Sequence, residues 1–377
     1  MKLLFVTTIS DTVNAFLVPH IRFLIEQGNK VGVAFNIIQE VNPELLQLGC
    51  KVHQVDFQRN PLAGENLSAY RNIREIIMTE EYELVHVHTP VASFLTRLAC
   101  RNIRKVKVLY TAHGFHFFKG APKKNWAVYY TIEKIVARWT DGVITMNGED
   151  FEAAKGFKLR KSNSIYKVHG IGLDLKKFRP TTNEQKITLR REYGYNAEEF
   201  ILIYAGELSY RKHQDLLIKA ISIVKEKVPR VKLLLAGDGD RLEEYKELTD
   251  TLGVGRHVDF LGYRKDIQRL LAMADLAIST SRQEGLPVNV MEAMATGLPL
   301  IVTDCRGNRD LVTPGKNGFV VGVDDVEACA KGIIELYYSK ELRMKFAQKS
   351  RDMIEKYSLN QVIGEMKEIY SKHSVKC

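Results

Sequence analysis

The stretch "DLAISTSRQEGLPVNVMEAMATGLPLIVTD", residues 275–304, decides the fold class because it holds three element signals in one unbroken order. The apolar run at 275–281 predicts a strand, residues 288–296 predict a short helix, and the apolar run at 299–304 predicts a second strand. Strand, helix and strand in this order indicate a parallel sheet that helices cover on both faces.

Turn residues mark the ends of the helix in this stretch. Pro287 suits the first helical turn, Gly297 fits the position just past the last turn, and Pro299 follows the stop. Glu284 is therefore expected at the ligand-binding edge of the sheet, and Glu292 inside the helix that starts there.

The same alternation extends outward over the whole chain. Further strands are predicted at 2–8, 30–36, 51–57, 83–89, 107–114, 142–147, 200–208, 232–239, 258–263 and 318–323. Helices are predicted at 65–79, 124–139, 211–227, 240–252, 325–338, 340–356 and 359–373, and Pro19 predicts a kink in the first helical stretch. The pattern pauses at 166–180, which we interpret as a linker. We predict an α/β protein with two Rossmann-like doubly wound parallel-sheet domains that face an interdomain cleft.

Composition bounds the class of protein. The chain has 377 residues, of which 45% are apolar, which is enough for two domains with their own cores. No apolar run is long enough to span a membrane, and the start "MKLLFVTTIS" resembles a first strand more than a signal peptide. Five dispersed cysteines predict reduced thiols in a cytosolic protein rather than a disulfide framework or a zinc site.

Charge is uneven along the chain, whose formal net charge is +10. Residues 91–180 carry 18 basic and 6 acidic residues, whereas residues 181–377 carry 30 and 29. This asymmetry is consistent with an anionic partner for the first half, such as a lipid surface, an anionic acceptor or a nucleic acid, and equally with a solvated basic surface. No aromatic-interleaved basic motif of a nucleic-acid binder is present.

Two motifs in the second half carry side chains suited to a phosphorylated sugar. In "YAGELSYRKHQ" (204–214) a strand ends and Arg211 and Lys212 stand where a helix begins, which favours an anion. Glu284 and Glu292 could each accept hydrogen bonds from paired hydroxyls of a sugar or ribose. The alternatives are an exposed basic pair, a capping Glu284 and a solvated Glu292.

Aspartates and histidines raise the question of a metal. Asp238 and Asp240 in "GDGD" form a D-x-D, but a Gly-Asp turn with Asp240 capping the next helix explains it, and we predict no metal and no cofactor. The histidines in "HVHT" (86–89) and "TAHGFH" (111–116) lack cysteine or acidic ligands at metal spacing. His113 is the favoured functional histidine, while His86 and His88 share one strand face and are equally compatible with a core role.

Together the motifs resemble family 4 of the retaining glycosyltransferases, which have the GT-B fold. The resemblance is carried by E-x7-E at Glu284 and Glu292 and by "AGEL…RK", "LLLAGDG", "VDFLGY" and "TPGKNGFVV", in that family's order. The N-terminal "TTISDTVNAFLVPH" and "YTAHGFHFFKGAPKKNW" look like the bacterial exopolysaccharide and capsule branch.

The resemblance implies roles for particular residues. It implies a catalytic set of His113, Arg211, Lys212 and Glu284, and a donor site of Gly206, Arg211, Lys212, Gly262, Tyr263, Arg264, Glu284, Gly285, Leu286 and Glu292. Many members of the family carry a Gly-Gly loop after the first strand, where this chain has "TISDTVNAF" instead. Ser10, Asp11 and Asn14 of this segment, with His88, are therefore expected on the acceptor side. A Gly-Gly-x-Pro-Glu segment is replaced by "CRGNRD" (305–310), which could give its acidic role to Asp310.

The resemblance also implies an activity and its setting. It implies an N-terminal acceptor domain (1–168), a nucleotide-sugar domain (175–355) and a C-terminal helix (356–377) that packs back on the first domain. The expected reaction is metal-independent, retaining transfer of a sugar, with N-acetylhexosamine favoured, from a UDP-sugar to a polyprenyl-diphosphate-linked glycan. The expected place is the cytoplasm, peripheral to an anionic membrane and beside other polysaccharide-assembly enzymes. A sugar-nucleotide 2-epimerase of the same fold and a non-catalytic nucleotide-sugar-binding protein are the alternatives.

Overall fold

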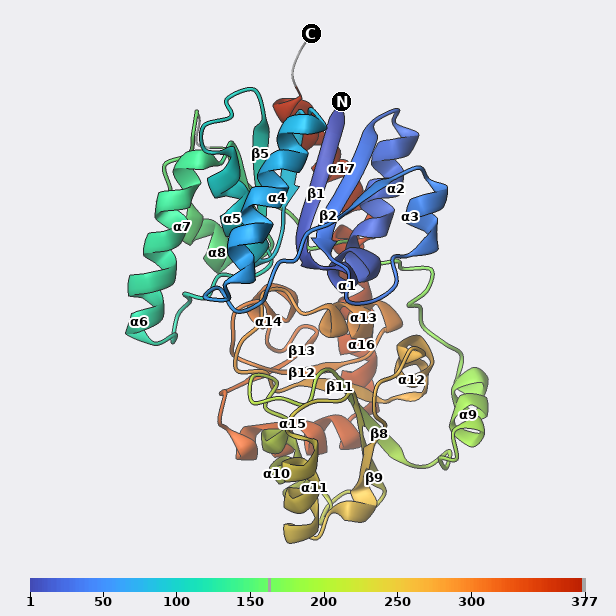
Figure 1. Cartoon of the computed structure of the whole chain (residues 1–377). Helices are drawn as coiled ribbons and strands as arrows, with labels where there is room; N and C mark the ends of the chain where they lie inside the picture. Colours follow the sequence, from blue (N-terminus) through green and yellow to red (C-terminus); the bar gives the residue numbers. More distant parts are fainter. Residues whose placement is uncertain (162–163, 375–377) are drawn as a thin grey trace. The chain divides into compact units, whose positions relative to one another are not determined.

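The computed structural model describes the chain except residues 162–163 and 375–377, and it divides into two compact units. The N-terminal unit comprises residues 1–172 and the C-terminal residues from 360, and the C-terminal unit comprises residues 173–359. Each unit is one parallel sheet covered by helices (Figure 1). No helix among the described residues is both long and apolar enough to cross a bilayer.

The N-terminal sheet has seven strands in the order β3-β2-β1-β4-β5-β6-β7. The strands are β1 (Lys2–Ile9), β2 (Lys30–Asn36), β3 (Lys51–Gln54), β4 (Leu84–Val87), β5 (Lys107–Ala112), β6 (Gly142–Thr145) and β7 (Ile165–Lys167). All pair in parallel, as the β-branched runs predict. The expectation that the pattern pauses at 166 was wrong, because β7 pairs with β6 before the chain leaves the unit.

Helices cover the N-terminal sheet on both faces. They are α1 (Ser10–Thr12), α2 (Val18–Glu26), α3 (Pro43–Gln47), α4 (Glu65–Thr79), α5 (Pro90–Cys100), α6 (Lys123–Asn125), α7 (Thr131–Val136), α8 (Gly148–Ala154) and α17 (Leu359–His373). One core joins buried side chains of α4 and α5, such as Ile73 and Ala99, to strand residues such as Val6 and Val85.

The first helical stretch departs from regular geometry at the place where Pro19 predicts a kink. Between α1 and α2 lies a π-helical turn, η1 (Val13–Leu17), and Pro19 stands in the first turn of α2. Because proline has no N–H to donate, it is accommodated where a new helix starts rather than inside a continuous one. The irregularity is therefore a π turn that ends just before the proline.

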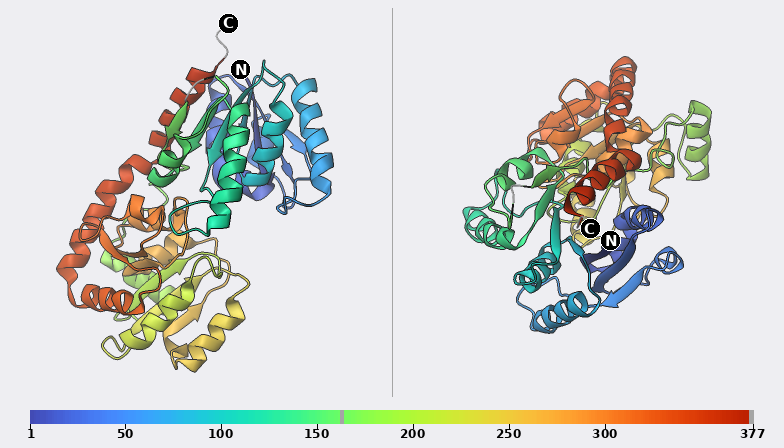
Figure 2. Two further views of the ribbon diagram at one scale, coloured as in Figure 1. Left: turned by 90° about the vertical axis from the view of Figure 1, so that its left-hand side faces the viewer. Right: turned by 90° about the horizontal axis from the view of Figure 1, so that it is seen from above.

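The last helix, α17, lies against the N-terminal sheet (Figure 2). The hydroxyl of Tyr370 lies 2.8 Å from Nδ1 of His86 on β4, and the hydroxyl of Tyr166 on β7 lies 3.2 Å from Nε2 of His373. Glu365 accepts a 3.0 Å hydrogen bond from the backbone N–H of His169. These buried and half-buried contacts fix the end of the chain to strands that precede it by some 200 residues or more.

The C-terminal sheet has six parallel strands in the order β10-β9-β8-β11-β12-β13. The strands are β8 (Phe200–Ala205), β9 (Val231–Ala236), β10 (Val258–Phe260), β11 (Leu276–Ser279), β12 (Leu300–Thr303) and β13 (Gly318–Val321). Its helices are α9 (Asn183–Glu192), α10 (Gln214–Val224), α11 (Leu242–Thr251), α12 (Ile267–Met273), α13 (Val288–Thr296), α14 (Asn308–Leu311), α15 (Val326–Tyr338) and α16 (Lys340–Ile354).

The stretch that decides the fold forms as its sequence predicts. Helix α13 spans the predicted residues 288–296, Pro287 is its N-cap, and Gly297 closes it with φ 76°, a left-handed conformation that glycine adopts without strain. The strands β11 and β12 that flank it pair directly, with Ile278 opposite Ile301.

Candidate active site

Strands β8 and β11 are neighbours at the point where the strand order of the C-terminal sheet reverses. From β8 the chain moves outward through β9 and β10, and then returns to the other side of β8 as β11. The loops after β8 and β11 therefore diverge at a topological switch point, where open α/β sheets bind their ligands. Residues 206–213 follow β8, and residues 280–287 follow β11.

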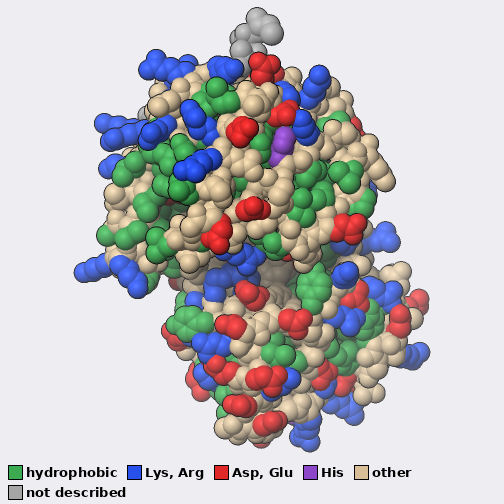
Figure 3. Space-filling model, viewed as in Figure 1, with side chains coloured by type: hydrophobic (Ala, Val, Ile, Leu, Met, Phe, Trp, Pro, Cys, Tyr) green, Lys and Arg blue, Asp and Glu red, His purple; other side chains and the backbone are tan. Residues whose placement is uncertain are grey.

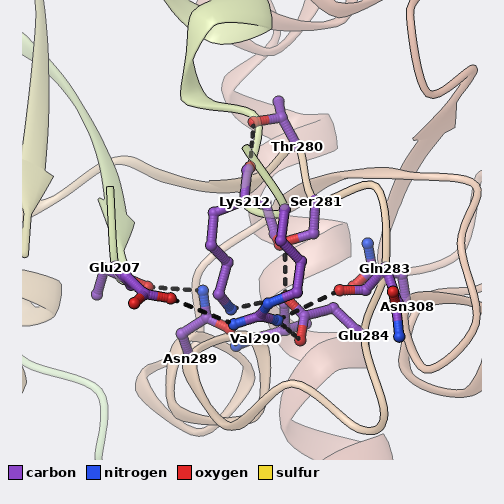
Figure 4. A network of polar contacts seen from close by, with 12 residues as sticks. Glu207, Lys212, Thr280, Ser281, Gln283, Glu284, Asn289, Val290 and Asn308 are labelled. Atoms are coloured by element: carbon purple, nitrogen blue, oxygen red, sulfur yellow. Dashed lines mark hydrogen bonds and ion pairs between the residues drawn. The ribbon is translucent and has the colours of Figure 1, made fainter. Parts of the chain in front are cut away.

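The charged residues predicted in these two loops meet each other. Nζ of Lys212 lies 2.6 Å from Oε1 of Glu284 (Figure 4). Nη1 of Arg211 lies 3.4 Å from Oε2 of the same carboxylate. Glu284 is buried, with 6% of its surface exposed, whereas Arg211 is half exposed. Two cations and one carboxylate thus share a site that is open on the arginine side.

Polar side chains hold this constellation from behind. The hydroxyl of Ser281 donates to Oε1 of Glu284 at 2.6 Å, and the hydroxyl of Tyr204 lies 2.7 Å from Oγ of Ser281. The Tyr204 hydroxyl also lies 2.9 Å from the carbonyl oxygen of Lys212, so it ties both loops to β8. Thr280 donates to the carbonyl of His213 at 2.8 Å. Ser281, Tyr204 and Thr280 were not singled out from the sequence, since hydroxyls at strand ends carry no distinctive spacing.

The segment "CRGNRD" (305–310) contacts the backbone of Glu284 and of the residue that follows it. Nε of Arg306 donates to the carbonyl of Glu284 at 2.9 Å. A side chain at Gly307, which has φ 80°, would lie 2.5 Å from the carbonyl oxygen of Gly285. Glycine at 307 is therefore required for the two loops to pack. Asp310 lies in the short helix α14, and its carbonyl accepts a hydrogen bond from Tyr357 at 3.2 Å.

The two glutamates have opposite electrostatic surroundings. Burial opposes ionisation of Glu284, but the charges of Lys212 and Arg211, with the hydrogen bonds to that carboxylate, hold its pKa below the ordinary value. Burial raises the pKa of the Glu292 carboxyl to about 7, against an opposing effect of Lys177. Glu284 is therefore a carboxylate at neutral pH, while Glu292 is poised between its two forms.

The turn "GDG" after β9 brings a third loop to the same sheet edge. A Cβ at Gly237 or Gly239 would stand 2.1 Å from the carbonyl oxygen of Gly206 or Leu208, so both positions need glycine. Asp238 accepts a hydrogen bond from the backbone N–H of Tyr263 at 2.9 Å, which joins this turn to the loop after β10. Asp240 is not the predicted helix cap: α11 starts at Leu242, its N-cap is Arg241, and no side chain caps it.

The loop after β10 holds the remaining predicted donor residues, Gly262, Tyr263 and Arg264. Gly262 has φ 62°, and Tyr263 is 73% exposed. Arg264 is engaged by both oxygens of Asp266, at 2.8 and 2.6 Å. The loop thus exposes Tyr263, and the hydrogen bond from the Tyr263 N–H to Asp238 ties the loop to the turn after β9.

Helix α10 starts at Gln214, three residues later than the predicted start at 211. Its N-cap, His213, has φ 56°, a left-handed conformation that is uncommon for a residue with a side chain. The buried His213 is held there by Asp215, whose Oδ1 lies 2.8 Å from Nδ1 of His213. Arg211 and Lys212 therefore lie in the turn before the helix rather than in its first turn.

In the N-terminal unit the predicted histidines lie together at the carboxyl edge of β4 and β5. Nδ1 of His88 lies 3.0 Å from Nε2 of His113, and the rings of His86 and His88 are 4.2 Å apart on one face, as the alternation predicts. Burial lowers the pKa of His113 to about 4 and, with the neighbouring histidines, that of His86 to about 3, so the cluster is uncharged at neutral pH.

These histidines have different surroundings. Both ring nitrogens of His86 are occupied, by Tyr370 and by the hydroxyl of Thr111 at 2.7 Å, which is a core arrangement. Nε2 of the buried His88 has no hydrogen-bond partner among the residues that the structure describes. His113 is partly exposed and is followed by Gly114, so it is the histidine of this group that reaches the surface of the unit.

Ser10, Asp11 and Asn14 follow β1, the neighbour of β4. The hydroxyl of Ser10 donates to the carbonyl of Gln39 at 3.1 Å, and the amide of Asn14 donates to the carbonyl of Glu40 at 2.9 Å. Both side chains thus hold the loop after β2, while Asp11 is partly exposed at the same end of the sheet.

Comparisons with known proteins place the chain among glycosyltransferases. A family model described as "Glycosyl transferases group 1" matches residues 185–353, and one described as "Glycosyl transferase 4-like" matches residues 2–147. The chain is 40% identical over 374 residues to EpsD of Bacillus subtilis (strain 168), a protein assigned to the glycosyltransferases, with 99% of this chain and 97% of the relative covered.

More distant relatives have more specific names. The chain is 25% identical to the UDP-Gal:alpha-D-GlcNAc-diphosphoundecaprenol alpha-1,3-galactosyltransferase of Escherichia coli, with 83% of this chain and 81% of the relative covered. Among solved structures, Anabaena HepE in complex with UDP and glucose matches with a TM-score of 0.81 at 21% identity, over 99% of this chain and 100% of that chain. The lipopolysaccharide glycosyltransferase WaaG matches with a TM-score of 0.77 at 16% identity, over 97% and 99% of the two chains.

Proposed function

This chain belongs to the GT-B glycosyltransferases, and on that premise we propose that it moves a sugar, with retention of anomeric configuration, from a UDP-sugar to a lipid-linked glycan. The observation that carries the proposal is the meeting of Arg211, Lys212 and Glu284 at the switch point of the C-terminal sheet. A diphosphate needs preorganised cations, and a sugar needs a fixed carboxylate.

The donor diphosphate takes the place of Glu284 as the partner of the two cations. Arg211 is already half exposed and offers a planar fork to phosphate oxygens, whereas Lys212 offers a point charge. When phosphate oxygens approach, Glu284 is released to accept hydrogen bonds from sugar hydroxyls. Ser281 and the backbone contact of Arg306 keep its carboxylate in place during that exchange.

Bond breaking places negative charge on the leaving diphosphate, and this site supplies positive charge in advance. A preorganised hydrogen-bond donor or cation directed at such developing charge lowers the activation free energy by about 3 kcal/mol. With Arg211 and Lys212 in this role, the proposed reaction is independent of a metal. In the proposed same-face attack, a diphosphate oxygen accepts the proton of the acceptor hydroxyl, and Glu284 positions the sugar.

The nucleoside part of the donor is assigned to Glu292 and to the loop after β10. Glu292 accepts hydrogen bonds from the ribose hydroxyls, and the exposed ring of Tyr263 lies along the base. The name of the Escherichia coli relative includes a UDP-sugar and a diphosphoundecaprenol acceptor, which supports the same classes of substrate here. N-acetylhexosamine is the favoured sugar.

The N-terminal unit is assigned to the acceptor, with His88 at its carboxyl edge and Ser10, Asp11 and Asn14 after β1. His113, which lies beside His88, is assigned to catalysis. We place the enzyme in exopolysaccharide or capsule synthesis, in the cytoplasm and peripheral to the inner face of the membrane, in reach of other polysaccharide-assembly enzymes. The excess of basic residues in 91–180 supports contact of this unit with an anionic membrane surface.

A panel of nucleotide sugars in a thermal-shift assay tests the proposal. The true donor at 100 times its Kd stabilises the folded protein by about 2.7 kcal/mol, whereas nucleotide sugars with a different base do not stabilise it. Incubation of the donor alone then separates the classes of enzyme. A glycosyltransferase leaves the sugar of the donor unchanged until a polyprenyl-diphosphate glycan is added, while conversion of the sugar nucleotide without acceptor would identify an epimerase instead.

A further inference from the structure

The helical run at residues 123–138 turns apolar side chains toward solvent. It consists of α6, a π-helical turn η2 (Trp126–Tyr130), α7 and the 3-10 turn η3 (Ala137–Trp139). Five large side chains on it are exposed by 38–52%: Trp126, Val128, Tyr129, Ile132 and Ile135. No window of ten positions elsewhere in the described chain holds more than three exposed residues of this kind. We call these five side chains the apolar face.

The opposite side of the same run is packed, so the apolar face has a fixed orientation. The Tyr130 ring lies 5.2 Å from that of Phe117 and 5.8 Å from that of Phe157, both in the core of the unit. Glu133 points inward as well, and its carboxylate accepts hydrogen bonds from the buried Arg97 at 2.8 and 3.2 Å. A rotation that hid Ile132 and Ile135 would pull both anchors out of the core.

The exposed charges within residues 119–138 have a single sign. Residues 119–138 include five basic residues, Lys119, Lys123, Lys124, Lys134 and Arg138, all of them exposed. The one acidic residue in this range is Glu133, whose side chain is 13% exposed and paired with Arg97. Figure 3 shows hydrophobic and basic side chains, with few acidic ones, over the region of α6 and α7.

The aromatic residues of the face have the character of side chains at a water–lipid boundary. Nε1 of Trp126 donates to the carbonyl of Phe118 at 3.2 Å, so its polar edge is satisfied while its ring is left outside. Tyr129 packs edge-on against His116, with the ring centroids 4.9 Å apart. Tryptophan and tyrosine rings of this kind sit at the headgroup level of bilayers.

An anionic bilayer matches both the exposed apolar face and the basic residues beside it. An apolar strip buried at the headgroup boundary with lysines beside it is the arrangement of interfacial helices. A second copy of this chain would bring the same lysines against these and be repelled. A protein partner would need an acidic rim around an apolar groove, and its binding would not depend on phosphatidylglycerol.

We propose that residues 123–138 form the surface by which the N-terminal unit docks on an anionic membrane, with the apolar face in the headgroup boundary and the surrounding lysines on lipid phosphates. The proposal rests on the proposed function in so far as a lipid-linked acceptor gives the enzyme a reason to be there. It goes further in assigning the contact to one helix, with the rest of the basic N-terminal surface in a minor role.

The test uses the full-length protein and vesicles of phosphatidylcholine with and without phosphatidylglycerol. The wild type is expected to float with the phosphatidylglycerol vesicles and to be released by salt. Ile132→Ser with Ile135→Ser, and separately Lys123→Glu with Lys124→Glu, are each expected to lower the partition coefficient by at least about tenfold. The matched controls, Met344→Ser and Lys331→Glu with Lys340→Glu, change exposed residues of the C-terminal unit and are expected to bind as the wild type does.

A spectroscopic measurement places the helix in the bilayer directly. The chain has two tryptophans, so Trp139→Phe leaves Trp126 as the single reporter. Its emission is expected to shift to the blue on addition of phosphatidylglycerol vesicles and to be quenched by brominated lipid. Unshifted emission in protein that floats would overturn the assignment to this helix.

The remaining outcomes separate this proposal from the proposed function. Thermal shift by the donor should be unchanged in the serine and glutamate variants, whereas Glu284→Gln should lose the donor and still float. Equal binding of wild type and variants, or equal binding to both kinds of vesicle, overturns the docking surface and leaves the transferase intact. A concentration-dependent dimer in light scattering that the serine variant abolishes would identify a second copy as the occupant instead.

Discussion

Lys212 and Glu284, which are 72 positions apart in the sequence, meet at 2.6 Å where the loops after two neighbouring strands diverge. The pair is nearly enclosed, with 12% of the lysine side chain and 7% of the glutamate side chain exposed. Each residue is thus the counter-charge of the other until a ligand arrives, and this mutual dependence leads to distinct expectations for the two positions.

Replacement of Glu284 by glutamine should abolish turnover and also cost stability, because the nearly enclosed Lys212 loses its counter-charge. The glutamine keeps the shape of the side chain and removes the charge that Lys212 and Arg211 neutralise. We expect less than a tenth of wild-type kcat, as for Arg211→Ala, since each removes a charge fixed at the reacting diphosphate or sugar. Steady-state assays with the identified donor and acceptor measure this. Retention of more than a tenth of wild-type turnover by both variants would rule out the assigned roles.

Replacement of Lys212 by methionine should also cost stability. It leaves the buried carboxylate of Glu284 with Arg211 at 3.4 Å as its remaining cation. Removing one partner of a buried pair costs roughly 3–5 kcal/mol, because the other charge stays in the interior. Urea denaturation measures the loss. The double variant Lys212→Met with Glu284→Gln should recover most of it, and failure to recover would show that the pair is not coupled.

Stability should fall as the pH rises through the titration range of Glu292. Its pKa is about 7 in the folded chain, above the ordinary value of 4.5, so the folded state keeps a proton that the unfolded state loses. The stabilisation from the protonated carboxyl is complete below pH 4.5 and is lost between pH 4.5 and 7, with a magnitude on the order of 3 kcal/mol.

Glu292→Gln isolates that contribution. The variant should match the wild type near pH 4.5 and be more stable than the wild type at pH 8, as measured by urea denaturation at the two values. Glu335→Gln, at an exposed position of α15, is the matched control and should show no such difference. Parallel pH profiles for Glu292→Gln and the wild type would contradict the raised pKa.

A methyl group at Gly239 should damage the proposed donor site through the backbone. The added Cβ would lie 2.1 Å from the carbonyl oxygen of Leu208, and a backbone atom cannot rotate away. We expect Gly239→Ala to lose more than about 2 kcal/mol of stability and to bind the donor weakly, by thermal shift. Gly364→Ala in α17 has open space around it and should gain up to about 1 kcal/mol, because alanine is the better helix former.

Loss of the Tyr370 hydroxyl should loosen the last helix. Tyr370→Phe removes the partner of Nδ1 of the buried His86, at a cost of about 1–3 kcal/mol for the group left unsatisfied. Tyr338→Phe removes a hydroxyl at an exposed position and should change stability by less than about 0.5 kcal/mol. Chemical denaturation of the two variants distinguishes the cases, and equal losses would mean that the contact with His86 contributes nothing.

The sequence predicted what local periodicity and turn chemistry control. Helix α13 has the predicted bounds because proline and glycine mark both of its ends, and α4 and α17 also have theirs. The three-residue strand β7 was missed because so short a run has no period of its own, and only pairing with β6 makes it a strand. The π turns were missed because no residue pattern signals them.

The candidate site was predictable as a set of positions and not as a set of contacts. The positions of the strand ends predicted that Arg211, Lys212 and Glu284 lie at one edge of the sheet. The ion pair between them does not follow from residue spacing. Neither do the supporting hydrogen bonds from Tyr204, Ser281 and Arg306. Those contacts depend on how three loops pack. His213 is a further case, since a left-handed residue is expected to be glycine, and here buried contacts with a carboxylate stabilise histidine instead.

The attachment of α17 to the N-terminal sheet has a consequence for synthesis on the ribosome. Tyr370 is made 284 residues after His86, and the whole C-terminal unit is translated in the interval. The first sheet to emerge is therefore the last to be completed, because α17 can cover it only after the C-terminal unit has been translated. A premature stop that removes α17 would leave every residue of the proposed sugar-nucleotide site in the C-terminal unit in place and still deprive the N-terminal sheet of one of its covering helices.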